Sequence, residues 1–441
     1  MNGPVPYNET SMPASDTASG DAPPTPSNSA SNSQAPALVP LRRNRGFRML
    51  WIGQVLSDTG TYAALIAYPL LILQLTHSPA IAGVVGTVRL IVELVLGLPG
   101  GALSDRLDRR LTMIVCDSAR VILLALLAAL VLTHLVSWQI VLVVAALDGA
   151  ASILFDPAAN AALPAIVADE QLERAWAATE ARQYASSLAG PALGGALFAL
   201  GSAVPFLADS VSYLASAGTV SRIHGKFKPE RAGPRKSLLH EAAEGIHLVW
   251  QHSLLRAVII QAPLINFAFN GVIFTLTIAL RKHGTAPGII GLVQAGIAIG
   301  GLAGAVIAPR IAGRFRLSQL VIVLVVVATI MFAVAALLLP STLVALPITI
   351  TFVLSPATNA ALFAAMLRVA PEDMRGRVNN TVILAATALA ALSPLAAGLL
   401  VQHFSGTVAM FAFAAVMAVG AILCIGLPGL RQAEATTAEL T

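Results

Sequence analysis

The sequence predicts an all-α integral membrane protein, with twelve transmembrane helices arranged in two six-helix pseudo-repeats. Its 441 residues are 56% hydrophobic and only 11% charged, whereas a soluble domain usually has about 25% charged residues. Apolar runs such as 121–132 and 320–328 are continuous, which favours helices over the alternating strands of a β-barrel. A nine-residue segment also recurs, because "FDPAANAAL" at 155–163 and "LSPATNAAL" at 354–362 match at six positions.

Twelve segments are long and apolar enough to cross about 30 Å of hydrocarbon as helices. The predicted spans are 47–75, 79–103, 111–135, 138–164, 174–200, 203–222, 256–280, 287–312, 317–339, 342–369, 376–402 and 406–429. They form an N-terminal six-helix bundle over residues 42–222 and a C-terminal six-helix bundle over residues 256–430.

Polar segments flank and separate the two bundles. Residues 1–41 are rich in Ser, Pro, Ala and Asn, which cannot build a core, so we predict a disordered cytoplasmic tail without signal-peptide features. Residues 431–441 form a second cytoplasmic tail. The cytoplasmic linker, 223–255, is predicted to hold an amphipathic helix at the membrane surface or, alternatively, a soluble inter-domain helix. The apolar face of this helix consists of Leu239, Ala242, Ile246, Val249 and Trp250.

Basic residues predict the orientation in the membrane. Lys and Arg gather before the first span, in the central linker, and in the loops that join spans two and three, eight and nine, and ten and eleven. The opposite loops hold only Arg281 and Lys282. The positive-inside rule therefore places both termini and the central linker of this multi-pass protein in the cytoplasm. The net charge of +5 then reflects topology and contact with anionic membrane lipids, not a nucleic-acid partner.

The internal repeat extends beyond the nine-residue segment. Offsets of 199 to 204 residues pair Pro157 with Pro356 and Gly100 with Gly304. Two halves in the same orientation fit a parallel repeat about an axis along the membrane normal. Chance similarity between Ala-rich helices is the alternative explanation.

Two motifs carry a family resemblance. The stretch "GGALSDRLDRR" ends at Arg110, and "GPALGG" begins at Gly190. With the span pattern, they resemble the major facilitator superfamily, in particular its bacterial branch of drug and siderophore exporters, which includes enterobactin exporters and macrolide efflux pumps. The residues that match motif A are Gly101, Asp105, Arg106, Arg109 and Arg110, with Asp108 where Gly is usual. Those that match motif C are Gly190, Pro191, Gly194 and Gly195.

The resemblance implies a gating role for both motifs. Asp105 would lie against the positive end of a neighbouring helix, expected to be the eleventh span, and latch the outward-facing state. A solvated basic loop is the alternative explanation for the arginines. The motif C glycines allow close backbone approach, and the family implies a contact between spans five and eight that seals the pathway. Plain helix packing is the alternative there.

Charges inside the hydrocarbon are costly and indicate function by default. Arg89 and Glu93 are four residues apart on one face of span two, either as an ion-binding pair that switches partners or as a structural ion pair. Asp58 in span one and Asp148 in span four are further candidates. Burial penalises the ionised carboxyl, so these acids suit proton loading and release. Proton-coupled members often carry an Arg where this chain has Ala145, which weakens that inference.

The second half is neutral in its interior, because its charged residues lie near helix ends. We therefore predict that the first half handles coupling ions and that the second contributes apolar and hydrogen-bonding surface to a substrate pocket. Helix packing is the alternative for each residue of this pocket. The candidate lining residues are Tyr62, Tyr68, Asn266, Phe267 and Asn270.

These features predict a monomeric secondary active exporter of amphipathic small molecules, drug or natural product, by proton antiport and alternating access. Its partners are the substrate, protons and membrane lipids. A siderophore or lipid exporter is the alternative, followed by a non-transporting membrane sensor. No enzyme motif is present and the eight histidines are scattered, so we predict no enzyme activity, cofactor or metal. Cys116 and Cys424 lie in apolar segments as buried thiols.

Overall fold

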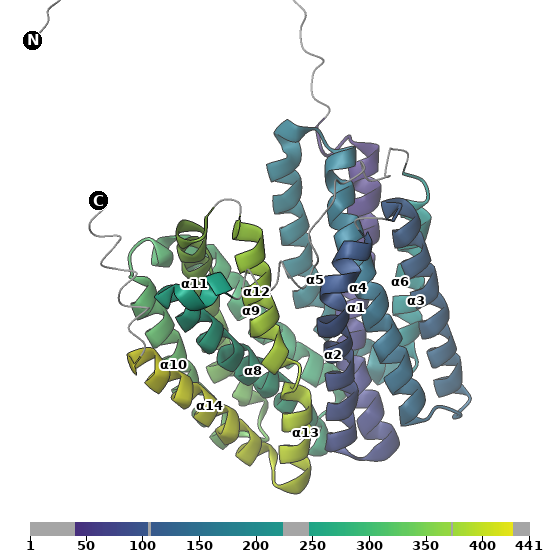
Figure 1. Ribbon diagram of the computed structural model, residues 1–441. Coiled ribbons are helices and arrows are strands. Elements are labelled where there is room, and N and C mark those ends of the chain that lie inside the picture. The colour runs from purple at the N-terminus through teal and green to yellow at the C-terminus, as the bar shows by residue number, and fades with distance from the viewer. Residues whose placement is uncertain (1–39, 105–106, 224–246, 372–373, 427–441) are drawn as a thin grey trace, which may run out of the picture. The chain divides into compact units, whose positions relative to one another are not determined.

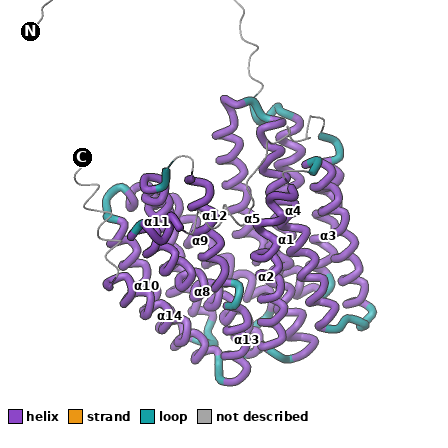
Figure 2. Tube along the Cα trace, in the orientation of Figure 1, coloured by secondary structure: helices purple, strands orange, loops and turns teal. Residues whose placement is uncertain are grey.

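The computed structural model describes residues 40–104, 107–223, 247–371 and 374–426. Within these ranges all regular structure is helical, as Figure 2 shows, and the helices alternate with short loops. The predicted tail 431–441 and all but residues 40–41 of the predicted tail 1–41 lie outside the described residues.

The first six long helices make up what we call the first set. They are α1 (Arg45–Thr76), α2 (Pro79–Ser104), α3 (Arg109–Leu132), α4 (Trp138–Ile166), α5 (Leu172–Leu200) and α6 (Val204–Val220), with a short 3₁₀ turn η1 (Asp169–Gln171). The second set follows the central linker. It consists of α8 (Ser253–Lys282), α9 (Pro287–Ala312), α10 (Leu317–Leu338), η2 (Thr342–Val344), α11 (Ala345–Val369), α12 (Arg375–Ala390), α13 (Ser393–His403) and α14 (Gly406–Gly426).

Ten segments of the described chain are long and apolar enough to cross a membrane. Two predicted spans are not among these ten. Helix α6 has only 17 residues, and α5 is less apolar, with charges up to Arg182 followed by Gln, Ser and Gly residues among its apolar ones. The chain is thus a multi-pass, all-helical membrane protein.

The eleventh predicted span is interrupted. Helix α12 ends at Ala390 and α13 begins at Ser393, because Pro394 has no N–H to donate and its ring clashes with the carbonyl one turn earlier. The Ser393 hydroxyl instead donates a hydrogen bond of 2.7 Å to the Ala390 carbonyl. The break therefore creates a new helix N-terminus within an otherwise continuous apolar segment.

Side-chain caps fix two helix starts. The Asn44 side chain accepts a hydrogen bond of 3.1 Å from the Phe47 N–H at the start of α1. Asp108 does the same for the Leu111 N–H at the start of α3. Asp is a strong N-cap residue, which explains why the chain has Asp where motif A usually has Gly.

The helices of the two sets have matching neighbours (Figure 1). In the first set α1 packs against α5 and α6, α3 against α4 and α6, and α2 against α4. In the second set α8 packs against α12, α13 and α14, α10 against α11 and α14, and α9 against α11. Each helix of the first set thus has a counterpart in the second, with α12 and α13 together corresponding to α5.

The loops divide between two ends of the bundle. We call the end with the α2–α3, α4–α5, α9–α10 and α11–α12 loops the basic end, and the opposite end, with the α1–α2, α5–α6, α8–α9 and α13–α14 loops, the neutral end. The two sets meet mainly where α5 crosses α9 and α2 crosses α13, with a smaller contact between α1 and α8. Among the described residues, all hydrogen bonds between the sets lie toward the neutral end.

Large apolar side chains cover the outside of the described helices. Leu200, Leu337 and Leu135 are 79%, 72% and 70% exposed, as expected where hydrocarbon takes the place of water. The predicted linker helix falls largely outside the described residues, since 224–246 are not described. Of its apolar face, Val249 is fully buried and Trp250 is 54% exposed.

Candidate functional site

A cluster of buried charges joins three helices of the first set. Arg89 of α2 and Arg120 of α3 both donate to the carboxylate of Asp148 in α4. The Arg120 Nε–Asp148 Oδ1 distance is 2.8 Å, and the Asp148 side chain is only 3% exposed. One acid therefore holds two arginines in a site that is closed to solvent.

Glu93 is the accessible member of this cluster. Its carboxylate lies 3.1 Å from the Arg89 guanidinium and its side chain is 28% exposed. A Cβ at Gly149 would contact both Arg89 and Glu93, so the glycine beside Asp148 leaves room for this ion pair. Arg89 thus bridges a sealed acid and an acid that solvent reaches.

The cluster continues into α6 through an aromatic ring. The Arg120 guanidinium lies 4.1 Å from the centroid of the Tyr213 ring, a cation–π geometry. The Tyr213 hydroxyl in turn lies 2.6 Å from the Thr61 hydroxyl of α1. Neither Arg120 nor Tyr213 was among the site residues predicted from the sequence.

A second ion pair joins α1 and α5. Arg182 donates to the Asp58 carboxylate, with the arginine side chain 3% exposed and the aspartate side chain 25% exposed. Arg182 was not among the site residues predicted from the sequence. The signal that predicts its pairing is the neighbour relation of spans one and five, which a single helix does not reveal.

Three further acids of the first set have no arginine, lysine or histidine within ion-pair distance among the described residues. Asp117 in α3 is fully buried, Asp209 in α6 is 1% exposed, and Asp156 in α4 is exposed. The Ser212 hydroxyl lies 3.0 Å from Asp209 Oδ1. A Cβ at Gly60 would overlap the Asp209 carboxyl, so the absence of a side chain at Gly60 admits this acid against α1.

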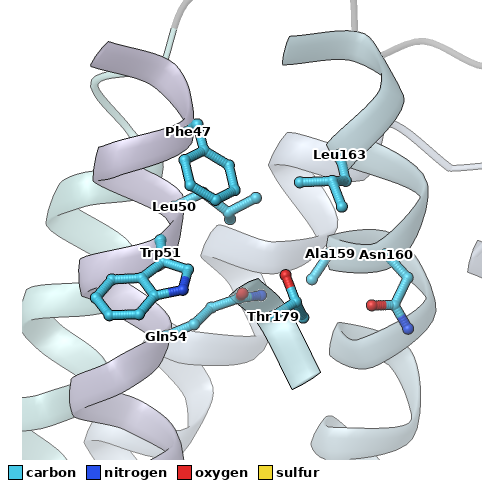
Figure 3. A pocket seen from close by; sticks show the side chains of 8 residues that line it. All are labelled: Phe47, Leu50, Trp51, Gln54, Ala159, Asn160, Leu163 and Thr179. Carbon is cyan, nitrogen blue, oxygen red and sulfur yellow. The ribbon is translucent and has the colours of Figure 1, made fainter. Parts of the chain in front are cut away.

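A small pocket lies between α1, α4 and α5 (Figure 3). It is shallow and partly open to solvent. Gln54 and Thr179 add polar groups to its lining, and the Trp51 Nε1–H donates a hydrogen bond of 3.0 Å to the Ala178 carbonyl. None of these residues was predicted as a site residue. The lining residues are Phe47, Leu50, Trp51, Gln54, Ala159, Asn160, Leu163 and Thr179.

The predicted pocket residues differ in accessibility. Tyr68 is 4% exposed and its ring packs 5.2 Å from that of Phe206, so it lies in the helix core rather than at a pocket surface. Tyr62 is half-buried against Gly190.

The three candidates on α8 are more open. Phe267 is half-buried and stacks on Phe413, with ring centroids 5.4 Å apart. Asn266 and the exposed Asn270 each donate 2.9 Å hydrogen bonds to a carbonyl one turn earlier. That bond leaves their amide oxygens as acceptors.

The described part of motif A binds the first set together. Asp105 and Arg106 lie outside the described residues, and Gly101 lies in α2. Arg109 donates a 2.8 Å hydrogen bond to the Ala161 carbonyl of α4. Arg110 donates to the carbonyl of Ser221, the residue that ends α6. Both arginines therefore bind helix carbonyls within the first set, which a solvated loop would not do.

The motif C glycines face two different helices. A Cβ at Gly190 would overlap Tyr62, and one at Gly194 would overlap the Ala63 carbonyl, both in α1. A Cβ at Gly195 would instead overlap the Pro287 carbonyl of α9. The motif thus packs α5 against its own set and against the other set at once.

The crossings between the sets share one sequence pattern, a proline followed four residues later by a glycine. At each crossing, a Cβ on either glycine would overlap the carbonyl oxygen of the proline on the partner helix. The contacts are reciprocal and bring Cα–H groups onto carbonyl oxygens. The four pairs are Pro191 and Gly195 with Pro287 and Gly291, and Pro79 and Gly83 with Pro394 and Gly398.

Comparisons with known proteins show which proteins this chain resembles. A family model described as Major Facilitator Superfamily matches residues 50–380. The chain is 26% identical over 394 residues to the multidrug efflux pump Tap of Mycolicibacterium fortuitum, covering 86% of this chain and 94% of the relative. It is 25% identical over 345 residues to the enterobactin exporter EntS of Citrobacter koseri, covering 77% and 81%. A solved structure of a bacterial homologue of the iron transporter ferroportin, in an inward-facing state, has a TM-score of 0.66 at 18% identity, covering 87% of this chain and 98% of that one.

Proposed function

Because the chain belongs to the Major Facilitator Superfamily, and is thus a membrane transporter rather than an enzyme, we propose that it is a secondary active exporter. Its substrates would be amphipathic small molecules, drugs or natural products, exchanged for protons by alternating access. The names of two relatives, a multidrug efflux pump and an enterobactin exporter, support export as the direction of transport.

The proposal includes twelve spans in two six-helix repeats, over residues 42–222 and 256–430, joined by a cytoplasmic linker. Here α5 and α6 each count as a span, and α12 with α13 as one. The matching neighbours in the two sets support this division. We assign the basic end to the cytoplasm of a bacterial inner membrane, with both tails on that side and the protein as a monomer. The arginines at this end support the orientation.

The observation that carries the proposal is a surplus of acids in the first set. Its helices hold five carboxylic acids that are buried or half-buried, against three buried arginines. Uncompensated charge in hydrocarbon is costly, so the surplus calls for protons or a cationic substrate. The acids are Asp58, Glu93, Asp117, Asp148 and Asp209, and the arginines are Arg89, Arg120 and Arg182.

Two of these acids suit proton exchange. Asp58 and Glu93 are each paired with a buried arginine, while their own side chains are 25% and 28% exposed. A proton that binds either acid breaks its ion pair and releases the arginine to another acceptor. Asp148 is held by two arginines out of solvent, so we assign it to positioning Arg89 rather than to proton exchange.

The contacts between the sets fit a state open to the cytoplasm. They lie toward the neutral end at α2–α13 and α5–α9, whereas Asp156 and Asn160 of α4 and Asn359 of α11 are exposed. In this state substrate enters from the cytoplasm, and rocking of the two sets then opens the neutral end. Asp105 of motif A would latch that second state.

The charge of the first set favours cationic or neutral substrates. Asp156 is exposed and unpaired among the described residues, and the second set offers neutral groups such as Asn270 and Phe267. An anionic siderophore or lipid headgroup would meet like charge here. We therefore propose drugs or natural products as substrates ahead of siderophores and lipids.

The test is transport in proteoliposomes with an imposed pH gradient. The probe is the permanently charged cation ethidium, and a catecholate siderophore serves as the anionic comparison. Transport of ethidium should be accompanied by movement of protons in the opposite direction. The imposed pH gradient should move ethidium against its own concentration gradient. Asp58→Asn and Glu93→Gln should each abolish gradient-driven movement while the protein stays folded.

Glu180→Gln is the matched control, because Glu180 is an exposed acid of α5 with no ion-pair partner among the described residues. It should leave transport unchanged. Full gradient-driven efflux in both Asp58→Asn and Glu93→Gln would remove the coupling assignment. Movement of the siderophore and not of ethidium would favour the alternative substrate class.

A further inference from the structure

The α2–α13 crossing carries hydrogen bonds that the α5–α9 crossing lacks. Gln402 in α13 accepts two bonds at its Oε1 atom, from the Ser78 hydroxyl at 2.6 Å and from the Ala80 N–H at 3.0 Å. In the opposite direction, the Thr87 hydroxyl of α2 accepts a 3.0 Å bond from the Leu395 N–H. Among the described residues, no hydrogen bond joins α5 to α9, although the two helices pack closely at Gly195 and Gly291.

Two of these three bonds satisfy a first-turn N–H of a helix with a side chain from the other set. Ala80 lies in the first turn of α2, which begins at Pro79. Leu395 is the third residue of α13, which begins at Ser393. First-turn N–H groups have no acceptor within their own helix. The two helices therefore cap each other across the boundary between the sets.

The break before α13 makes the Leu395 N–H depend on Thr87. In a continuous helix this donor would find a carbonyl one turn earlier. The interruption at 391–392 removes that acceptor, and Thr87, which is 4% exposed, replaces it from the other set. An unsatisfied donor in hydrocarbon is costly, so the broken helix is stable here only while α2 and α13 stay together or while water replaces Thr87.

We propose that these residues form a latch that holds the neutral end closed and breaks in each transport cycle. The α2–α13 latch consists of Ser78, Ala80, Thr87, Leu395 and Gln402. The glycine contacts at both crossings supply close packing, and the latch adds directional bonds at one of them. Separation of the sets exposes the Leu395 and Ala80 donors to water, which then satisfies them.

The test uses isosteric changes and a distance readout. Thr87→Val keeps the shape of the side chain and removes the hydroxyl that accepts from the Leu395 N–H. Gln402→Leu removes the exposed amide oxygen that accepts from Ser78 and Ala80. The matched control is Thr133→Val, because the Thr133 hydroxyl lies at the neutral end of α3 and donates only to carbonyls of its own helix.

Spin labels at Ser202 and Ala286, in a background with Cys116 and Cys424 replaced by Ala, report the opening at α5–α9. A second pair at Leu75 and His403 flanks the latch. Distance distributions from pulsed electron–electron double resonance then give the ratio of open to closed molecules in detergent and in lipid nanodiscs.

We expect Thr87→Val to raise the open-to-closed ratio about tenfold, since it leaves a buried donor unpaired in the closed state. Gln402→Leu should raise it about threefold, because this site is exposed and water competes for the bond. Thr133→Val should leave the ratio as in the unchanged protein. Both label pairs should lengthen together.

Two results would overturn the latch. One is a ratio in Thr87→Val and Gln402→Leu that equals the ratio in Thr133→Val. The other is an unchanged Leu75–His403 distance in molecules whose Ser202–Ala286 distance has lengthened, which would make α2–α13 a permanent hinge. The measurement needs no substrate, so it stands apart from the outcome of the transport assay.

Discussion

Replacement of Asp148 by Asn tests whether this acid holds the first set together. The change removes the carboxylate that pairs with both Arg89 and Arg120, whose side chains are 9% and 4% exposed. Within ion-pair distance, only Glu93 would remain to balance two buried arginines. Loss of one partner from a buried ion pair costs about 3–5 kcal/mol.

The expected shift follows from the size of the set that carries the cluster. For 150–250 residues, each kcal/mol lowers the midpoint of thermal unfolding by roughly 2–4 °C, so Asp148→Asn should lower it by about 10 °C. Glu93→Gln removes a partly exposed pair worth less than about 1 kcal/mol. Its midpoint should therefore fall by no more than about 3 °C.

A double variant separates charge balance from packing. Arg120→Gln together with Asp148→Asn leaves Arg89 paired with Glu93 and no net charge in the cluster. Neutral replacement of a whole buried pair is often tolerated. The midpoint of thermal unfolding of the double variant should therefore lie at least halfway from that of Asp148→Asn to that of the unchanged protein. Full recovery is not expected, because Arg120 also stacks on Tyr213.

The assay is the monodisperse fraction of detergent-purified protein after heating, read by fluorescence size-exclusion chromatography. All variants are heated at one rate, since membrane proteins of this size unfold irreversibly. A midpoint for Asp148→Asn within about 2 °C of the unchanged protein would refute the structural role. So would a double variant no more stable than Asp148→Asn alone.

Two other predictions compare neighbouring positions. Gly194→Ala should destabilise the protein by about 1–3 kcal/mol, because the new Cβ meets the Ala63 backbone within the first set. Gly195→Ala should destabilise it less, because its Cβ meets Pro287 of the other set. This second change should instead raise the fraction of molecules in which the Ser202–Ala286 label pair is open. Equal thermal midpoints and equal label distances in the two variants would contradict this division. Arg182→Gln should lower the thermal midpoint less than Asp148→Asn, because water reaches the 25% exposed Asp58 left without a partner; an equal or larger loss would show that Asp58 is sealed.

Most helix positions could be predicted from the sequence. The predicted span 287–312 coincides with α9, and 79–103 lies one residue short of the end of α2. Long continuous apolar runs bounded by Gly, Pro and basic residues leave the chain little alternative in hydrocarbon. The break before α13 was not predicted, although Ser393 and Pro394 mark it. A proline within an apolar run does not decide between a kink and a new helix start, because neighbouring helices decide it.

The candidate site was predicted in its members and only partly in its pairings. Arg89 and Glu93 were predicted to share a face and do form an ion pair, because the spacing of four residues acts within one helix. The bonds from Arg89 and Arg120 to Asp148 join α2, α3 and α4, and the bond from Arg182 to Asp58 joins α5 and α1. Such pairings depend on rotation and depth of separate helices, which a single sequence does not specify.

Helix α2 carries both the buried charges and the closing contact, on opposite faces. Thr87 and Arg89 are two residues apart, and at about 3.6 residues per turn their side chains point roughly 200° apart. Thr87 accepts its bond from α13 of the second set, while Arg89 binds Asp148 of α4 within the first set. A rotation of α2 about its own axis would therefore move Arg89 relative to Asp148 and Thr87 relative to Leu395 at the same time. One rigid helix thus links the charge cluster of the first set to the contact at the neutral end.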